Sequence, residues 1–291
     1  MNISTYPEFA PIDWNMRTDL HPRLSMLTDG ISEFTFADLY LFRHKYQYHL
    51  SCLPDRHIVI SGIEEGKKFF MLPCGVSDMQ VIKELFESHD YLKNLSESLV
   101  ETHRIDLEKE GYTVEEDRDN FDYLYLRKDL AHLPGRKLHK KRNLVNAFVN
   151  NYNYCEQRIT EENRRDTLRV LEKWLEGREE RADYDAAKEA LEKMNELDLR
   201  GCLTYVDGEP VAYSLGEPLA RGKAFAVHFE KAHGNYKGIY QFINRSFASM
   251  LPRHFVHINR EQDLGDPGLR QAKMSYRPCG FIKKYTVRPS G

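Results

Sequence analysis

The feature that most constrains the fold is a succession of secondary-structure patterns that occurs twice along the 291 residues. In the first half, strand-like runs at 57–63 and 68–72 flank a Glu-Gly turn, and a helix, a strand, a short helix and a strand follow. In the second half, runs at 203–206 and 210–215 flank an Asp-Gly turn, and a similar succession follows. The residue identities do not repeat, so the similarity lies in the pattern alone. A duplicated α/β domain fits this order better than one fold does.

The predicted class is therefore α/β (α+β), with two tandem domains that each hold a mixed, mostly antiparallel sheet flanked by helices. We expect the first domain at 1–120 and the second at 121–291, with inserted helices at 134–197. Thr35 and Ser77 are predicted to cap helices. The remaining expected elements are a strand near Leu99-Val100, a helical turn at 104–109, strands at 112 onward, 123–126 and 224–229, a helix at 238–250, and strands at 254–259 and 281–287.

Composition restricts the class of protein. Hydrophobic residues make up 41% and aromatic residues 12%, which is enough for a core and excludes disorder over most of the length. The net charge of -3 is small, so affinity for an anion must come from a local patch. The five cysteines are scattered without a Cys-x-x-Cys pair, which indicates reduced thiols and no zinc site. With no signal peptide and no apolar run that could span a bilayer, the sequence predicts a soluble cytoplasmic protein.

A charged stretch at 257–276 is the first candidate site. The run Phe255-Val256-His257-Ile258 is typical of a strand, and it leads directly into charged residues. Glycines and a proline at 265–268 then require a loop, and 269–274 has room for one or two helical turns. Charged side chains at the end of a buried strand are typical of a binding or catalytic rim. An ion-paired surface loop is the alternative.

Two further stretches could hold an anion. The basic run 136–142 begins a predicted helix, where cations oppose the helix dipole and would be stabilised by a bound phosphate. A solvated helix face that pairs with acids elsewhere is the alternative. At 230–238 a strand ends, a glycine-bearing loop follows and a helix begins, which is an arrangement that can hold a pyrophosphate. A tight turn needs the same glycines, and neither the Rossmann spacing nor a Walker loop is present.

The histidines do not indicate a metal site. His254 and His257 are expected on opposite sides of a strand, and His228 and His233 are expected to flank a turn, so a structural role is predicted for each. Glu261, Asp263 and Asp266 could hold a cation, but the full spacing of a calcium loop is absent. No Gly-x-Ser-x-Gly motif or Cys/His pair indicates covalent hydrolysis. We therefore expect no metal and no tightly bound cofactor.

The sequence resembles an uncharacterised bacterial family that is grouped with the C-terminal catalytic domain of phosphatidylglycerol lysyltransferase. The resemblance covers nearly the whole chain and rests on 123–126 leading into 134–143, on Asn235 to Tyr240, and on 258–276 followed by Pro278, Gly280 and Phe281. It implies two GNAT-like acyltransferase domains in tandem, similar to the Fem-type ligases, which transfer an aminoacyl group from a charged tRNA. Simpler GNAT enzymes use acetyl-CoA. In either case catalysis is largely orientation and stabilisation of an oxyanion.

Position and chemistry suggest a role for each candidate residue in such a transferase. Glu261 or Asp263 would accept the acceptor's proton, with Tyr276 as a third catalytic residue. Arg260, Arg270 and Lys273 would bind the reacting carbonyl or the acceptor's carboxylate. The phosphates of a tRNA end or a coenzyme would be held by Lys137, Lys140, Lys141, Arg142, Lys237 and Gly238.

These expectations together predict an acyl or aminoacyl transferase that uses aminoacyl-tRNA or acyl-CoA and modifies an amine or a hydroxyl. Peripheral contact with a membrane is compatible with this reading. One alternative is a non-catalytic binding protein with a degenerate acyltransferase fold that recognises a nucleotide, an RNA or a protein. Another alternative is an acetyl-CoA-dependent N-acetyltransferase. Glu261→Gln and Asp263→Asn would separate an enzyme from a binder, because only an enzyme has turnover to lose.

Overall fold

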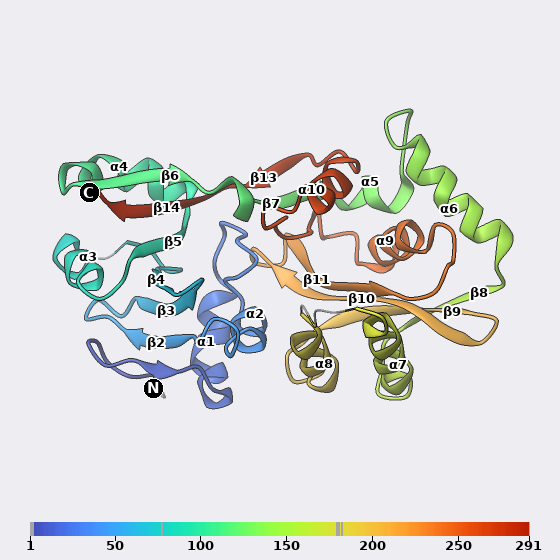
Figure 1. The fold of residues 1–291 in the computed structure, drawn as a ribbon, viewed down its shortest axis with the longest axis horizontal. Helices are drawn as coiled ribbons and strands as arrows, with labels where there is room; N and C mark the ends of the chain where they lie inside the picture. The colour runs from blue at the N-terminus through green and yellow to red at the C-terminus, as the bar shows by residue number, and fades with distance from the viewer. Residues whose placement is uncertain (1–2, 77, 179–180, 182, 291) are drawn as a thin grey trace. The chain divides into compact units, whose positions relative to one another are not determined.

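The computed structural model describes residues 3–76, 78–178, 181 and 183–290, and the chain forms two compact units (Figure 1). Unit 1 comprises Met1–Asp122, Gln262–Asp266 and Phe281–Gly291, and unit 2 comprises Tyr123–Glu261 and Pro267–Gly280. The sequence predicts a boundary near 120, with every later residue in the second domain. The division differs after Glu261, because the C-terminal strand pairs with strands of unit 1.

Unit 1 is built on a seven-stranded sheet in the order β1-β2-β3-β4-β5-β14-β6. Neighbouring strands of this sheet are antiparallel except β4 and β5, which are parallel. The predicted hairpin is confirmed as β3 and β4. The bounds are β1 Ala10–Pro11, β2 His49–Cys52, β3 Ile58–Glu64, β4 Lys67–Met71, β5 Tyr91–Ser96, β6 Tyr112–Glu116 and β14 Lys284–Pro289.

The helices of unit 1 begin where the sequence supplies a cap. The side chain of Thr35 accepts a hydrogen bond from the backbone N–H of Asp38, which confirms the predicted cap. Asp78 caps α3 through the N–H of Gln80, and the predicted cap Ser77 lies outside the described residues. The helices are α1 Arg17–Leu24, α2 Phe36–Leu41, α3 Met79–Phe86 and α4 Glu97–Lys109, with 3-10 turns at Trp14–Met16 and Arg118–Asn120.

The predicted strand near Leu99-Val100 is wrong, whereas the helix predicted at 104–109 is present but begins earlier. Both stretches belong to α4, and the strand of this region is β5, which ends at Ser96. Val100 and Leu107 are buried and lie seven residues apart, so they fall on one face of a two-turn helical repeat. A pair of adjacent apolar residues is too short to distinguish a strand from a helix.

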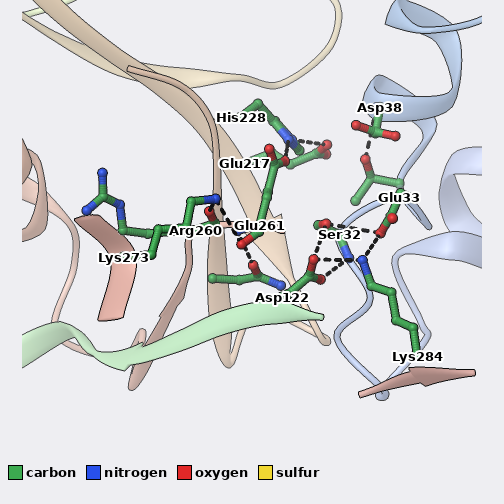
Figure 2. Close-up of polar contacts among 12 residues, drawn as sticks. Ser32, Glu33, Asp38, Asp122, Glu217, His228, Arg260, Glu261, Lys273 and Lys284 are labelled. Carbon is green, nitrogen blue, oxygen red and sulfur yellow. Dashed lines mark hydrogen bonds and ion pairs between the residues drawn. The ribbon is translucent and has the colours of Figure 1, made fainter. Parts of the chain in front are cut away.

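A buried charge cluster fixes β14 in the sheet of unit 1 (Figure 2). The Lys284 ammonium, which is inaccessible to solvent, pairs with Glu33 and lies 2.7 Å from Asp122 Oδ1. Ser32 donates hydrogen bonds to Asp122 from its backbone N–H at 2.9 Å and from its hydroxyl at 3.0 Å. Burial alone would lower the pKa of Lys284, but Asp122 and Glu33 raise it above its usual value. The C-terminal strand is therefore held by charge as well as by ladder hydrogen bonds.

Unit 2 contains a second seven-stranded sheet in the order β13-β7-β12-β11-β10-β9-β8. β11 and β12 run parallel, whereas β12 with β7, β11 with β10, β10 with β9 and β9 with β8 are antiparallel. The predicted strand at 254–259 is shorter than expected. The bounds are β7 Asp122–Leu126, β8 Tyr154–Arg158, β9 Arg200–Val206, β10 Glu209–Leu219, β11 Ala224–Ala232, β12 His257–Asn259 and β13 Gly280–Ile282.

Helices cover both faces of this sheet, with α9 on one face and α7 and α8 on the other (Figure 1). The region 134–197 holds helices, as expected, and also β8, which extends the sheet. Gly238 precedes α9 with a φ of 89°, and a Cβ there would lie 2.1 Å from the carbonyl oxygen of Leu144 in α6. The helices are α5 Arg127–His132, α6 His139–Asn151, α7 Arg164–Leu175, α8 Tyr184–Glu192, α9 Ile239–Met250 and α10 Pro267–Met274.

Candidate active site

The candidate site of unit 2 forms where the parallel strands β11 and β12 stop pairing. The two strands are in register over three residues only, which end with Ala226 opposite Asn259. The chain after β12 continues with Arg260 and Glu261, and β11 continues with His228 and Glu230. Beyond this point the two strands no longer form ladder hydrogen bonds, and polar side chains lie there. Figure 2 shows three of them, Arg260, Glu261 and His228. The carboxyl end of a parallel strand is a common position for such groups.

A β-bulge in β11 positions His228. Leu215 of β10 pairs with Phe229 and Gly216 pairs with Val227, so His228 is an extra residue on β11. The bulge requires glycine on the partner strand, because a Cβ at Gly216 would lie 1.9 Å from the carbonyl oxygen of Ala226. A bulge redirects a side chain that would otherwise follow the strict alternation of a strand.

The His228 ring lies between two carboxylates. Its Nε2 is 3.0 Å from Glu217 Oε1 and its Nδ1 is 2.6 Å from Glu261 Oε1, and the side chain is only 1% exposed. Burial alone would lower the pKa of His228, but the hydrogen bonds and charges of Glu217 and Glu261 raise it well above its usual value. The ring is therefore an imidazolium that donates a hydrogen bond to each carboxylate, and the three groups carry a net charge of about -1.

A second cluster surrounds the Arg260 guanidinium. Its Nη2 is 2.9 Å from Glu230 Oε1, and both side chains are largely buried. Asn244 of α9 lies against this pair, and its amide oxygen accepts a hydrogen bond from Arg260 at 3.0 Å when oriented toward it. The guanidinium also lies 5.3 Å from the centre of the Tyr276 ring. Burial raises the pKa of the Tyr276 hydroxyl above its usual value, so this tyrosine is a neutral hydrogen-bonding group.

Lys141 brings a second cation to the same place. Its ammonium lies 4.3 Å from the centre of the Tyr276 ring, on the half-buried side of α6. Burial lowers the pKa of Lys141, and the charge of Arg260 lowers it further. Among the described residues no carboxylate forms an ion pair with Lys141, whereas Arg260 is balanced by Glu230. The cluster therefore has one positive charge in excess, which suits an anionic or carbonyl-bearing ligand.

Lys273 supports the site from behind. Its ammonium donates to the backbone carbonyls of Arg260 at 2.7 Å and Glu261 at 3.1 Å. Glu261 has a left-handed backbone conformation, with φ of 57°, and its N–H is bonded to the side chain of Asn259 at 2.7 Å. Lys273 therefore shapes the turn that presents Glu261, and its ammonium is occupied by protein groups. Arg270 lies half-buried on the same helix, α10.

Asp263 lies in unit 1, whereas Glu261 lies in unit 2. The Asp263 side chain is fully buried, lies 3.4 Å from the Arg118 guanidinium and accepts a hydrogen bond from the N–H of Gly265 at 3.0 Å. These contacts fix the loop at 262–266. The geometry thus gives Asp263 a structural role in its own unit, and of the two predicted proton acceptors Glu261 is the one in the candidate site.

The predicted phosphate-binding residues divide into exposed and structural ones. Lys137, Lys140 and Lys237 are exposed. Arg142 donates to the backbone carbonyls of Leu133 at 2.6 Å and Gly135 at 3.2 Å, so it holds the turn before α6. Gly238 is required for the close packing of α9 on α6, as described above.

The structure brings together Arg260, Glu261, Tyr276, Lys141 and Lys273 of the predicted residues. Glu217 is not among the predicted site residues, and Glu230 is predicted only as the first residue of the stretch 230–238. His228 is predicted in the strand 224–229 with a structural role, and in the structure it lies in β11 between Glu217 and Glu261. A buried acid within an apolar strand is the signal that could have identified Glu217. Across the described residues, no helix is both long and apolar enough to cross a membrane.

Comparison with known families settles what this chain is related to. Residues 25–288 match the family model described as phosphatidylglycerol lysyltransferase, C-terminal. The chain belongs to this family. The expected resemblance is thereby confirmed, and so is the fold class of two mixed, mostly antiparallel sheets flanked by helices.

Solved structures and a curated protein are also similar to this chain. A conserved protein of unknown function from Bacteroides thetaiotaomicron is 30% identical, with a TM-score of 0.83 over 97% of this chain and 99% of that one. L-PGS from Bacillus licheniformis is 14% identical, with a TM-score of 0.65 over 100% of this chain and 95% of that one, which shows the shared fold. An uncharacterised protein of Mycoplasmoides gallisepticum is 29% identical over 62% of this chain, and the match spans 60% of that relative's length.

Proposed function

We propose that this protein is an acyltransferase that moves an activated acyl or aminoacyl group to an amine or hydroxyl acceptor at the Arg260–Glu261 turn of unit 2. The observation that carries the proposal is the pairing of a fixed carboxylate, Glu261 held by His228, with an unbalanced cation, Lys141 beside Arg260. The Glu261 carboxylate can remove a proton from an acceptor, and the Lys141 ammonium can stabilise the negative charge that develops on an acyl oxygen. The family membership and the acyltransferase-like fold support the same reaction class.

The roles follow from the positions of the groups. The acceptor's nitrogen or oxygen forms a bond to the acyl carbon, and Glu261 takes the proton that the acceptor loses. The bond from the acyl carbon to the donor's oxygen or sulfur breaks, and the leaving group is protonated. Lys141 and the Tyr276 hydroxyl stabilise the tetrahedral oxyanion between these steps. Arg260, paired with Glu230, holds the Tyr276 ring in the position where the hydroxyl can reach the acyl oxygen.

The donor is proposed to be aminoacyl-tRNA or an acyl-CoA, and its phosphates are assigned to the exposed lysines Lys137, Lys140 and Lys237. Cations that contact phosphates release condensed counterions, so such binding weakens steeply as salt concentration rises. Fluorescent tRNA and acetyl-CoA should therefore be compared over a salt series with the wild-type protein and with Lys137→Glu/Lys140→Glu.

A charge-matched control is available on the other face of the sheet. Arg165 of α7 and Lys188 of α8 are exposed, and Arg165→Glu/Lys188→Glu changes the net charge by the same amount. We expect tRNA binding that is weakened by salt, reduced at least tenfold by Lys137→Glu/Lys140→Glu and nearly unaffected by the control. Binding of acetyl-CoA alone would assign the protein to the acetyl-CoA-dependent N-acetyltransferases. Binding of neither donor would refute the donor assignment.

Catalysis is separated from binding by Glu261→Gln. This variant keeps the shape of the side chain and removes its charge. We expect turnover of the bound donor to fall by two orders of magnitude or more, while the donor affinity stays within a factor of three. Unchanged turnover would remove Glu261 from the mechanism, and absence of turnover in the wild type with retained binding would favour the non-catalytic reading.

A further inference from the structure

A row of polar side chains crosses the sheet of unit 2 on the face that α9 covers. Ser214 of β10 lies directly opposite Glu230 of β11 and Cys202 of β9, and Thr204 of β9 lies opposite Glu156 of β8. Directly opposite residues in antiparallel strands share a face, with Cβ atoms about 4.5–5.5 Å apart, and residues two apart on a strand also share it. The five side chains therefore form one continuous row across four strands.

Contacts with α9 identify the covered face at both ends of the row. At one end, Asn244 of α9 lies against Glu230. At the other end, the Ser246 hydroxyl of α9 donates a hydrogen bond to Glu156. The row thus lies between the sheet and the helix. It starts at the Arg260–Glu230 pair of the candidate site and reaches β8, the last strand of the sheet.

Two hydroxyls in the middle of the row have no hydrogen-bond partner. The side chains of Thr204 and Ser214 are inaccessible to solvent, and no protein group among the described residues bonds to Thr204 Oγ1 or Ser214 Oγ. Cys202 lies between them in the row, opposite Ser214 and two residues before Thr204. Burial raises the pKa of Cys202, and the nearby charges of Glu156 and Glu230 raise it further, so the group stays a thiol with an S–H donor. Buried hydroxyls that lack partners are costly, and internal water commonly satisfies them.

We propose that ordered water molecules occupy this row and that the row conducts protons between Glu230 at the candidate site and Glu156 at the sheet edge. Glu156 suits the outer end, because it lies on the edge strand β8 and the residue is accessible to solvent, while its carboxyl is partly covered where Ser246 of α9 bonds to it. Burial of its carboxyl raises the pKa of Glu156, so the group takes up a proton more readily than an ordinary glutamate.

The need for such a row rests on the proposed function. An acceptor amine that arrives as an ammonium loses two protons when its nitrogen is acylated. One proton ends on the oxygen or sulfur that leaves the acyl carbon, and the second must leave the protein. No change of oxidation state and no further reactant is involved.

Hydration of the row can be tested without any donor or acceptor. Thr204→Val and Ser214→Ala remove the two hydroxyls at nearly constant shape. If the row is hydrated, each variant removes a hydrogen bond to an internal water molecule and lowers the midpoint temperature of thermal unfolding. If the row is dry, removal of an unsatisfied hydroxyl raises the midpoint, and that result would overturn the proposal. Thr167→Val is the matched control, because the buried Thr167 hydroxyl already bonds to the Asn163 carbonyl at 3.2 Å, so its loss should lower the midpoint in either case.

Proton conduction is tested by the exchange of one thiol. In a variant that keeps only Cys202 of the five cysteines, infrared spectroscopy follows the conversion of S–H to S–D after transfer to deuterium oxide. We expect exchange much faster than global unfolding, and at least tenfold slower exchange in Glu156→Gln. Glu209→Gln, a change of an exposed acid on β10, should leave the rate unchanged. The inference would be overturned if the thiol exchanged only on global unfolding, or if Glu156→Gln left the exchange rate unchanged. Either result would leave the transferase proposal standing.

Discussion

Replacement of His228 by leucine is the most informative perturbation of the candidate site. Leucine fills a similar volume and removes both hydrogen bonds of the imidazolium. Glu217, whose side chain is 5% exposed, is then a buried carboxylate without a cation, and Glu261, at 21%, is left partly hydrated. Removal of one partner from a buried ion pair costs about 3–5 kcal/mol. Glu217 should account for most of this cost, because Glu261 can regain water.

The double variant Glu217→Leu/His228→Leu tests where the cost arises. It removes the stranded buried carboxylate together with the ring, so we expect it to regain most of the lost stability, to within about 1–2 kcal/mol of the wild type. Urea unfolding at constant ionic strength, followed by circular dichroism, measures all three proteins. A loss below about 1 kcal/mol in His228→Leu, or a double variant less stable than the single one, would refute the argument that the pair is charged and buried.

The pH dependence gives an independent check of the same reasoning. The folded-state pKa of His228 is raised above its unfolded value of about 6.5. Its contribution to stability is therefore fully present below about pH 6.5 and is lost as the pH rises through the folded-state pKa. The difference between the wild type and His228→Leu should be largest near pH 6 and should shrink in alkali. A difference independent of pH from 6 to 10 would contradict the assignment of an imidazolium.

Three further changes have expected outcomes. Lys284→Met removes the ammonium that pairs with the buried carboxylates of Glu33 and Asp122 in unit 1, and we expect a loss of about 3–5 kcal/mol in urea unfolding; a change under 1 kcal/mol would contradict the buried cluster. Gly216→Ala cannot be accommodated 1.9 Å from a carbonyl oxygen without moving β10, so amide NMR shifts of β10 and β11 should change together, and unchanged shifts around His228 would argue against the bulge. Lys273→Met should lower turnover with little effect on donor affinity, and Lys273→Arg should restore part of it, because the ammonium holds two carbonyls; equal loss in both variants would point to a direct contact with substrate.

The elements that the sequence predicts correctly are those fixed by neighbouring residues. The hairpins β3–β4 and β9–β10 follow from short turns, and the Thr35 cap follows from a side chain three residues before its partner. The return of β14 to unit 1 is different, because it depends on pairing between residues about 190 positions apart, as for Lys284 with Ser96. No local pattern distinguishes it from a strand that stays in the second unit.

The candidate site was predictable only in part for the same reason. The charged turn at Arg260–Glu261 is visible in the sequence, because a strand ends there. Its partners depend on register: a bulge aims His228 at Glu217, eleven residues earlier on the neighbouring strand. A single extra residue in β11 decides whether these side chains come into contact. The composition of the sequence does not reveal where such a bulge occurs.

The duplicated fold contains two such strand junctions, and their chemistry differs. In unit 1 the parallel strands β4 and β5 pair at only two positions, ending with Phe70 opposite Leu92. The next residues of β5 are Lys93, which is paired with Glu64, and Asn94, whose amide donates to the sulfur of Met71 at 3.5 Å. Within the described part of unit 1, no histidine lies between carboxylates at this junction. The same pairing of parallel strands thus ends in an ion pair and an amide–sulfur contact in unit 1 and in an acid–imidazole–acid cluster in unit 2. We therefore expect substitutions at the junction of unit 1 to change stability and those at the junction of unit 2 to change turnover.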